Sequence, residues 1–516
     1  MTFSTPAKKL FYEYFEWSCT NYAGHTEWMR GSQSHAYIFD MMVFFYRLQR
    51  CMLWGEIAPE IIKFIRPAWE RVSAEQVRRV VLCVDLEAVS VARQYVAQVR
   101  REKSDRTPRP IEDIGPLEAE GLIPDHDFIG CFLNRQWRFE KFYPFIMDEL
   151  IRLITVPINC ELILHGFRKD QTHVISHNNR EPRIYGDLAE NIRMSATEAD
   201  LSTASFEDHM RTNGWDVTLQ SGDGDVLPIA MLSQLRRSSA SGVGQLMVHH
   251  GYMETDPKYV VMERVEQQIN ITRDELSAQT GLKVEYPIMD WVALLFLTGN
   301  DYVPAVSSIT PHKLVSAYCK ANLDACSLAR PIEIKGSRYW SVQLPALQGL
   351  LKHAYLQASP GGRTPARLNS GMTYNQIVDA TNTSHYPLPS PARMRYLASN
   401  LEFCLNYFFG EPVPTIPKMV LMPPGDRTFY GYGVNRTGTL ERLYKLRDEE
   451  AAGPGAPTAS DMEIGIRTLK CSEQEINPPE PAFDIVSIAM STVSTGRDTP
   501  KNDQPLIVDH YQPHMT

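Results

Sequence analysis

Short apolar runs alternate with amphipathic segments along the first half of the chain. The clearest are AYIFDMMVFF at 36–45, RRVVLCVD at 78–85 and ELILHG at 161–166, and WDVTLQSGDGDVL follows at 215–227. The first three are apolar at consecutive positions, which is typical of parallel strands buried on both faces. Strands separated by helical segments indicate βαβ crossovers. The pattern therefore predicts an α/β fold, with a mostly parallel, Rossmann-like sheet and helices on both of its faces.

Other segments follow different patterns. Residues 86–104 have the pattern of a helix, and the Pro-rich stretch after it extends a candidate arch or lid insertion to about 86–150. Residues 168–187 are polar and predict a loop. Residues 290–299 and 392–409 predict buried helices.

Composition limits the class of protein. With 516 residues, 43% of them hydrophobic and 22% charged, the chain can form a large core. No apolar run reaches the roughly 20 residues of a membrane span, and the N-terminus lacks the apolar segment of a secretory signal. The nine cysteines contain no CxxC pair and suit free thiols in a reducing compartment. We therefore expect an intracellular protein, cytoplasmic or nuclear, that is neither secreted nor embedded in a membrane.

Seven acidic residues stand in short motifs, several of them directly after predicted strands. They are Asp40 in YIFD, Asp85 in VLCVD, Glu198 and Asp200 in TEAD, Asp223 and Asp225 in SGDGD, and Asp301 in GND. The carboxyl ends of parallel strands meet at one edge of a sheet, so these carboxylates are expected to converge. Buried carboxylates that share a cleft repel one another unless cations compensate them, and oxygen ligands select Mg²⁺ or Mn²⁺. The sequence thus predicts a site for two such ions.

Each motif also has a purely structural interpretation. SGDGD is a common turn, TEAD suits a helix start capped by Thr197, and Asp301 after Gly299 suits a helix end. The joint appearance of all seven acids after successive strands favours the metal site.

The order of these motifs resembles the metal-binding signature of the PIN-like 5′ nucleases, which comprise flap endonucleases, the XPG group and 5′→3′ exoribonucleases. Within that superfamily, DWVALLFLTGNDYVPAV and YLASNLEFCLNYFFGEPVP are most similar to the exoribonucleases. The resemblance implies that Glu198, Asp200 and Asp223 ligate one ion. It assigns Asp225 and Asp301 to the other, whereas Asp40 and Asp85 contact an ion directly or through water.

The resemblance also implies phosphate contacts. Family members carry a Lys and then a basic pair after the second acid, and this chain has Arg93, Gln98, Arg100 and Arg101 displaced by one or two positions. Arg93, Arg100 and Arg101 share a helix face and are expected to act on one phosphate, with Gln98, Lys103 and Lys313 as further substrate contacts. A solvated basic face is the structural alternative. The chain departs from the family by lacking its Met-Gly start and by having Leu86 after the second acid.

The leading hypothesis is a nuclease dependent on two Mg²⁺ or Mn²⁺ ions that hydrolyses single-stranded RNA from its 5′ end. A DNA flap endonuclease and a non-catalytic nucleic-acid-binding scaffold remain as alternatives, and the net charge of −9 argues against non-specific wrapping of nucleic acid. The expected organisation is a helical N-terminal extension at 1–35, a PIN-like core at 36–320, a helical C-terminal extension at 321–448, and a largely disordered tail at 449–516. Pro, Gly and Ser are frequent in that tail, which could recruit a protein partner.

Overall fold

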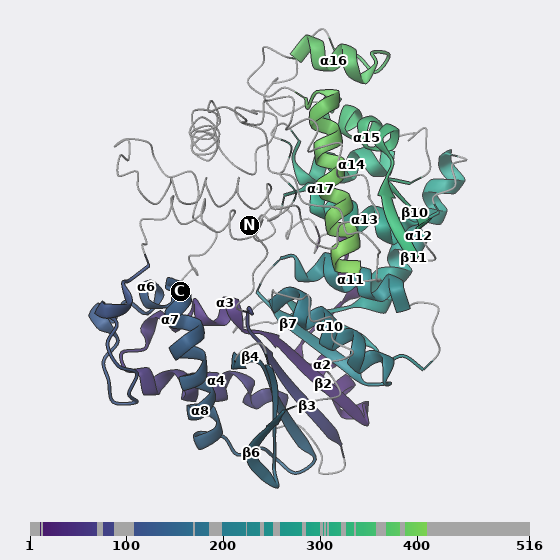
Figure 1. The fold of residues 1–516 in the computed structure, drawn as a ribbon. Helices are drawn as coiled ribbons and strands as arrows, with labels where there is room; N and C mark the ends of the chain where they lie inside the picture. The colour runs from purple at the N-terminus through teal and green to yellow at the C-terminus, as the bar shows by residue number, and fades with distance from the viewer. Residues whose placement is uncertain are drawn as a thin grey trace. The chain divides into compact units, whose positions relative to one another are not determined.

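The structure is a computed structural model, and the residues that it describes divide into two compact units (Figure 1). Those residues are 11, 14–69, 76–86, 108–168, 171–184, 199–222, 224–237, 242–250, 258–280, 285–299, 303, 306, 309–320, 327–334, 337–357, 368–381 and 388–409. One unit, the sheet unit, comprises Phe15–Ser90 and Ser104–Gln267. The other, the helical unit, takes in the described residues that lie within Met1–Tyr14 and Gln268–Phe409.

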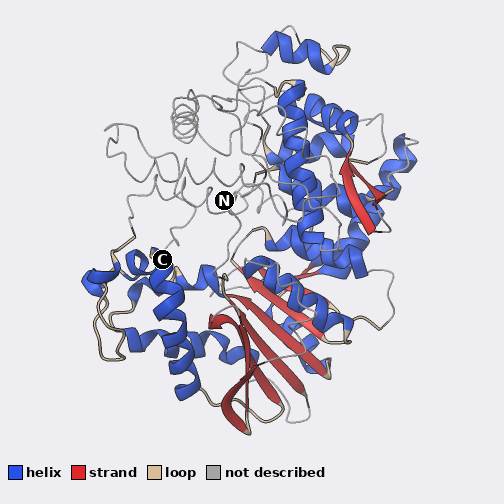
Figure 2. Cartoon of the chain, viewed as in Figure 1, coloured by secondary structure: helices blue, strands red, loops and turns tan. Residues whose placement is uncertain are grey.

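The sheet unit is organised around nine strands in the order β1-β9-β8-β7-β2-β3-β4-β5-β6. The five central strands, from β8 to β4, are parallel, and both flanks are antiparallel. The strands are β1 (Cys19–Thr20), β2 (Ser34–Asp40), β3 (Val77–Cys83), β4 (Cys160–Arg168), β5 (Gln171–Ser176), β6 (Asn179–Ile184), β7 (Asp216–Ser221), β8 (Leu246–His250) and β9 (Tyr259–Val261). The predicted α/β class with a mostly parallel sheet is confirmed (Figure 2).

Helices cover both faces of this sheet. On one face, Val80 and Leu82 of β3 belong to the same apolar core as residues of α4 and α8. On the other face, Arg79 of β3 contacts Met210 of α10, because successive strand residues point to opposite sides. The α-helices of the unit are α2 (Tyr22–Gly31), α3 (Met41–Phe45), α4 (Ile57–Ile65), α6 (Phe128–Leu133), α7 (Arg135–Trp137), α8 (Tyr143–Leu153), α10 (Ala199–Thr212) and α11 (Val226–Arg237).

Short turns of helix connect these elements. The 3-10 turns are η1 (Glu16–Ser18), η2 (Leu48–Arg50), η3 (Trp54–Glu56), η4 (Arg66–Ala68), η5 (Ile111–Asp113) and η6 (Pro124–His126), and η7 (Arg138–Phe142) is a π-helical turn. Within the candidate insertion, residues between 108 and 150 pack against the sheet, since Phe128, Phe142 and Ile146 belong to the same apolar core as Val80 and Leu82. Apart from Leu86, the helix predicted at 86–104 lies outside the described residues.

One predicted strand and one predicted loop need correction. The run 36–45 is a strand only to Asp40, because the Asp40 carboxylate accepts a hydrogen bond from the Met42 amide and begins α3. The predicted loop at 168–187 is wrong, since β4 extends to Arg168 and β5 and β6 follow it. The polar Thr172 is buried in β5 because its hydroxyl pairs with His165 of β4 at 2.9 Å. The strands predicted at 78–85 and 161–166 are confirmed.

The helical unit contains both predicted late helices. Helix α13 (Pro287–Leu297) is buried along its whole length, and α17 (Pro391–Phe409) packs on it through stacked Phe296 and Phe408 rings. Its other elements are β10 (Ala329–Ile334), β11 (Ser337–Val342), α14 (Pro311–Lys320), α15 (Leu344–Leu356) and α16 (Tyr374–Thr381), and α12 (Met262–Thr280) begins in the sheet unit. No described helix is both long and apolar enough to cross a membrane.

The two units differ from the expected division of the chain. Within the expected extension at 1–35, β1 pairs with β9 and so belongs to the nine-stranded sheet. The boundary between the units falls inside α12, after Gln267, rather than near residue 320. The expected tail at 449–516 lies outside the described residues.

Candidate functional site

The carboxyl edge of the parallel strands has a topological switch point between β2 and β7. From β2 the sheet continues through β3 and β4 on one side and through β7 and β8 on the other. Ligands of open α/β sheets bind outside the carboxyl ends of the strands at such a point. Asp40 is the last residue of β2 and aligns with Cys83, the last residue of β3. Asp40 therefore lies directly beside the switch point.

Asp40 is held from two directions. Its Oδ1 accepts a hydrogen bond of 2.9 Å from the Met42 amide, and its Oδ2 accepts one of 2.8 Å from the Ser221 hydroxyl at the end of β7. The residue is only 2% exposed. Burial raises the pKa of the neighbouring Cys83 thiol well above its ordinary value, and the negative charge of Asp40 raises it further. Asp40 thus presents a fixed carboxylate at the switch point.

Asp85 follows β3 by two residues and lies beside the same methionine. Its amide donates to Met42 Sδ at 3.5 Å, and its Oδ1 accepts a hydrogen bond of 3.1 Å from the amide of Ala199. Ala199 is the first residue of α10, so a carboxylate there interacts favourably with the helix dipole. The contact places the start of the TEAD helix, including half-buried Asp200, next to the end of β3.

Asp225 comes immediately before α11 and is buried. Its carbonyl accepts the hydrogen bond of the Ile229 amide in the first turn of that helix. Asp225 is four residues beyond Ser221, whose hydroxyl bonds Asp40. Asp40, Asp85, Asp200 and Asp225 therefore lie at or next to elements that end or begin at one edge of the sheet.

The remaining predicted residues divide between two groups. Lys313 lies on α14 of the helical unit, where partial burial lowers the pKa of its ammonium group. Eight others lie outside the described residues, and they are Glu198, Asp223, Asp301, Arg93, Gln98, Arg100, Arg101 and Lys103.

The donor chemistry at the edge suits a hard cation, because all four described acids offer carboxylate oxygens. Among the residues that the structure describes, no three His, Cys, Asp or Glu side chains lie close enough together to hold a metal ion. Three of the seven predicted ligands are outside that part of the chain. The described residues by themselves therefore form no metal-binding group.

Tyr143 and Arg138, which lie near the acids, were not predicted from the sequence. The hydroxyl of Tyr143 donates to Met42 Sδ at 3.4 Å. Burial raises the pKa of this phenol above its ordinary value, the positive charge of Arg138 lowers it, and Asp85 and Asp40 raise it. The run RQWRFEKFY at 135–143, which mixes basic and aromatic residues, was the available signal.

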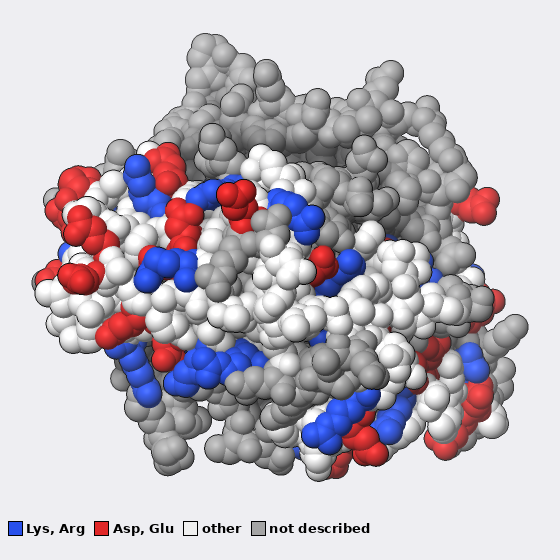
Figure 3. All heavy atoms as spheres, turned by 90° about the horizontal axis from the view of Figure 1, so that it is seen from below, with Lys and Arg blue, Asp and Glu red and all other residues white. Residues whose placement is uncertain are grey.

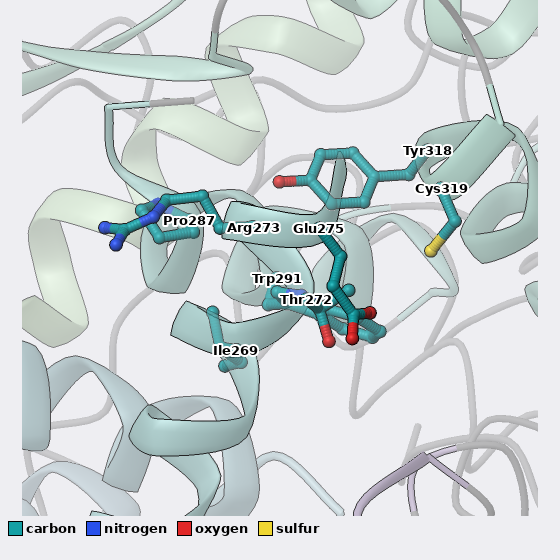
Figure 4. A pocket seen from close by; sticks show the side chains of 8 residues that line it. All are labelled: Ile269, Thr272, Arg273, Glu275, Pro287, Trp291, Tyr318 and Cys319. Atoms are coloured by element: carbon teal, nitrogen blue, oxygen red, sulfur yellow. The ribbon is translucent and has the colours of Figure 1, made fainter. Parts of the chain in front are cut away.

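A separate pocket lies within the helical unit, between α12, α13 and α14 (Figure 4). Trp291 at its wall packs against the ring of Tyr14 at 5.5 Å, and Arg273 is paired with Asp274. The pocket contains none of the predicted site residues. Its lining residues are Ile269, Thr272, Arg273, Glu275, Pro287, Trp291, Tyr318 and Cys319.

The described surface seen from below carries charges of both signs, with Lys and Arg interspersed among Asp and Glu (Figure 3). That face gives no indication of a broad positive region. Comparison with protein-family models and with curated proteins finds no match for this chain. The functional assignment therefore depends on the residues themselves.

Proposed function

We propose that this protein is a divalent-metal-dependent 5′ nuclease that hydrolyses phosphodiester bonds of single-stranded RNA. The observation that carries the proposal is the meeting of Asp40 and Asp85 around Met42 at the carboxyl edge of the sheet. Ser221 and Ala199 connect these two carboxylates to the strand and helix that precede Asp225 and contain Asp200. That Asp40, Asp85, Asp200 and Asp225 border neighbouring elements of one sheet edge supports the proposal.

Hydrogen bonds orient the carboxylates at this edge. Ser221 and the Met42 amide hold Asp40, and the Ala199 amide holds Asp85. Burying several carboxylates at one edge is costly unless cations compensate their charge. Bound Mg²⁺ or Mn²⁺ would supply that compensation, and a pair of ions suits displacement at phosphorus.

RNA is favoured as the substrate because of the two exoribonuclease-like segments, which overlap α13 and α17. A flap endonuclease acting on branched DNA is the second candidate, based on the TEADLSTASF form of the third motif. A scaffold without catalysis is the third.

The deciding experiment incubates labelled, 5′-phosphorylated RNA with the full-length protein and Mg²⁺. Native protein should cleave it, and Asp85→Asn and Asp225→Asn should reduce the rate by more than the roughly 10- to 100-fold typical of outer-shell changes at metal sites. In Asp85→Asn the side-chain amide oxygen would still accept the Ala199 hydrogen bond, so the charge is removed and the contact is kept.

Asp216→Asn is the matched control. Asp216 begins β7, at the end of the strand opposite to Ser221, and its Oδ1 accepts a hydrogen bond from the Gln245 amide that asparagine can retain. This variant should cleave RNA at the native rate. Faster cleavage of a branched DNA duplex would favour the flap endonuclease. No cleavage of either substrate by native protein would refute the nuclease proposal and leave the scaffold.

A further inference from the structure

Arg138 occupies an unusual position beside the acidic edge. It begins η7, the π-helical turn between α7 and α8, and such turns occur frequently at functional sites. Its guanidinium lies over the ring of Phe132 at 4.9 Å and over that of Phe139 at 5.1 Å. The residue is only 7% exposed. Two aromatic faces therefore hold a nearly buried cation in place.

The charge of Arg138 has no acidic partner among the described residues. None of their carboxylates lies within ion-pair distance of its guanidinium, and its buried Nε has no hydrogen-bond acceptor there. Arg211, another buried arginine of this unit in the last turn of α10, pairs by contrast with Glu207 at 3.0 Å and with the Gly244 carbonyl at 2.7 Å. A buried guanidinium without an anion is costly, so an arriving anion would be bound favourably.

Contacts between side chains lead from Arg138 to the acids. Phe132, under the guanidinium, contacts Tyr143 with ring centroids 6.4 Å apart. The Tyr143 hydroxyl donates to Met42 Sδ, and Met42 contacts both Asp40 and Asp85. The charges of Arg138 and of the two carboxylates also act on the same phenol, in opposite directions. Tyr143 thus lies within electrostatic range of both the Arg138 cation and the two acids.

We propose that Arg138 binds a phosphate group of the nucleic-acid substrate beside Asp40 and Asp85. The proposal rests on the proposed nuclease function. Carboxylates repel a phosphodiester, and a guanidinium fixed by two rings supplies the opposite charge where the backbone has to approach. Arginine suits the task because its fork can donate two parallel hydrogen bonds to phosphate oxygens, whereas lysine acts as a point charge.

The test measures equilibrium binding in EDTA, where no cleavage occurs, with inorganic phosphate and a 5′-phosphorylated RNA decamer as probes. Native protein should bind both, and Arg138→Gln should weaken binding by about tenfold or more, as expected for a lost charge-assisted hydrogen bond. Arg152→Gln is the matched control, because Arg152 on α8 is 59% exposed in its side chain and paired with Glu149. Its affinity for both probes should equal that of the native protein.

A second variant keeps the test valid if Arg138→Gln fails to fold. Arg138→Lys retains the charge over the two rings, and circular dichroism and the thermal midpoint verify its fold. It should bind the decamer several-fold more weakly than native protein because the bidentate contact is lost. Native affinity in Arg138→Lys, or in a folded Arg138→Gln, would overturn the proposal, as would native protein that binds neither probe.

The outcomes separate this site from the nuclease assignment. Phosphate binding that depends on Arg138, in a protein that cleaves no RNA, would support the site and refute the nuclease. Cleavage with an unchanged KM in Arg138→Gln would refute the site and support the nuclease. A higher KM with a nearly unchanged kcat is the expected result if both hold.

Discussion

Ser221 donates a hydrogen bond of 2.8 Å to Oδ2 of Asp40 and thereby connects the ends of β7 and β2. Both residues are buried, and they lie on the two sides of the switch point in the sheet. This contact orients the carboxylate at the centre of the candidate site. Its removal should therefore affect stability as well as activity.

Ser221→Ala should lower the free energy of unfolding by about 1.5–3 kcal/mol, because a buried carboxylate loses one of its donors. Urea denaturation monitored by circular dichroism measures the change. Ser34→Ala, at the opposite end of β2, is the control and should shift the free energy by no more than about 0.5 kcal/mol. Equal effects of the two substitutions would contradict the prediction.

Mg²⁺ or Mn²⁺ should bind the native protein and stabilise it. At a cation concentration about 100 times Kd, the free energy of unfolding should rise by about 2.7 kcal/mol, and EDTA should reverse the gain. Asp40→Asn should abolish the effect, since the amide still accepts the Met42 hydrogen bond but carries no charge. Titration calorimetry measures binding, with Asp216→Asn as control. Undiminished binding by Asp40→Asn would exclude Asp40 as a ligand.

Two buried histidines should make the sheet unit sensitive to acid. His25 and His35 both contact the Thr218 hydroxyl, at 2.9 and 3.0 Å. Burial, with His249 nearby, lowers the pKa of His25 to about 3. Burial, with Arg78 and His25 nearby, lowers the pKa of His35 well below its ordinary value.

Both histidines bind more protons in the unfolded state, so stability falls as pH drops below about 6.5. Between pH 6 and pH 4 each contributes a slope of up to about 1.4 kcal/mol per pH unit. His35→Gln removes one titrating group, and its amide can still bond Thr218. Urea denaturation across this range should show a shallower slope for the variant than for the native protein. Identical slopes would contradict the prediction.

Asp290 in α13 should have the opposite pH dependence. Its carboxylate accepts hydrogen bonds from the Leu328 amide at 2.7 Å and the Tyr318 hydroxyl at 3.1 Å, yet complete burial raises its pKa to about 8. The folded state therefore binds the proton more tightly, and the stability this group contributes below pH 4 is lost as pH rises towards 8. Asp290→Asn should become more stable relative to native by up to about 1.4 kcal/mol per pH unit in that window. A constant difference from pH 4 to pH 8, measured by urea midpoints, would contradict this.

The buried pair of Arg211 and Glu207 should be sensitive to loss of one partner. Their charged atoms are 3.0 Å apart and both side chains are almost fully buried. Arg211→Ala should cost about 3–5 kcal/mol because it leaves the Glu207 charge uncompensated. The double variant Arg211→Met with Glu207→Gln should recover part of that loss. Arg152→Ala, which breaks an exposed pair, should leave the stability nearly unchanged.

Much of the fold could be predicted from local composition. The strands at 78–85 and 161–166 and the helices at 290–299 and 392–409 are continuous or periodic in their apolar residues, and such segments are buried in any compact arrangement. The β5-β6 hairpin could not be predicted. Its residues are polar, and Thr172 is stable inside the sheet only because His165, on another strand, completes its hydrogen bond.

The candidate site likewise contains residues that the sequence predicted and residues that it did not. An acid at the carboxyl end of an apolar strand lies at the same edge of a parallel sheet as the ends of its neighbouring strands. The sequence alone therefore indicated that Asp40 and Asp85 would share one edge. Arg138 and Tyr143 lie far along the chain from Asp40, and no periodicity relates them to it. Only the tertiary structure decided that they lie near the acids, because Phe132 and Met42 both contact Tyr143. The apolar pattern of a segment determines that it is buried, whereas the side-chain contacts it makes depend on which distant segment packs against it.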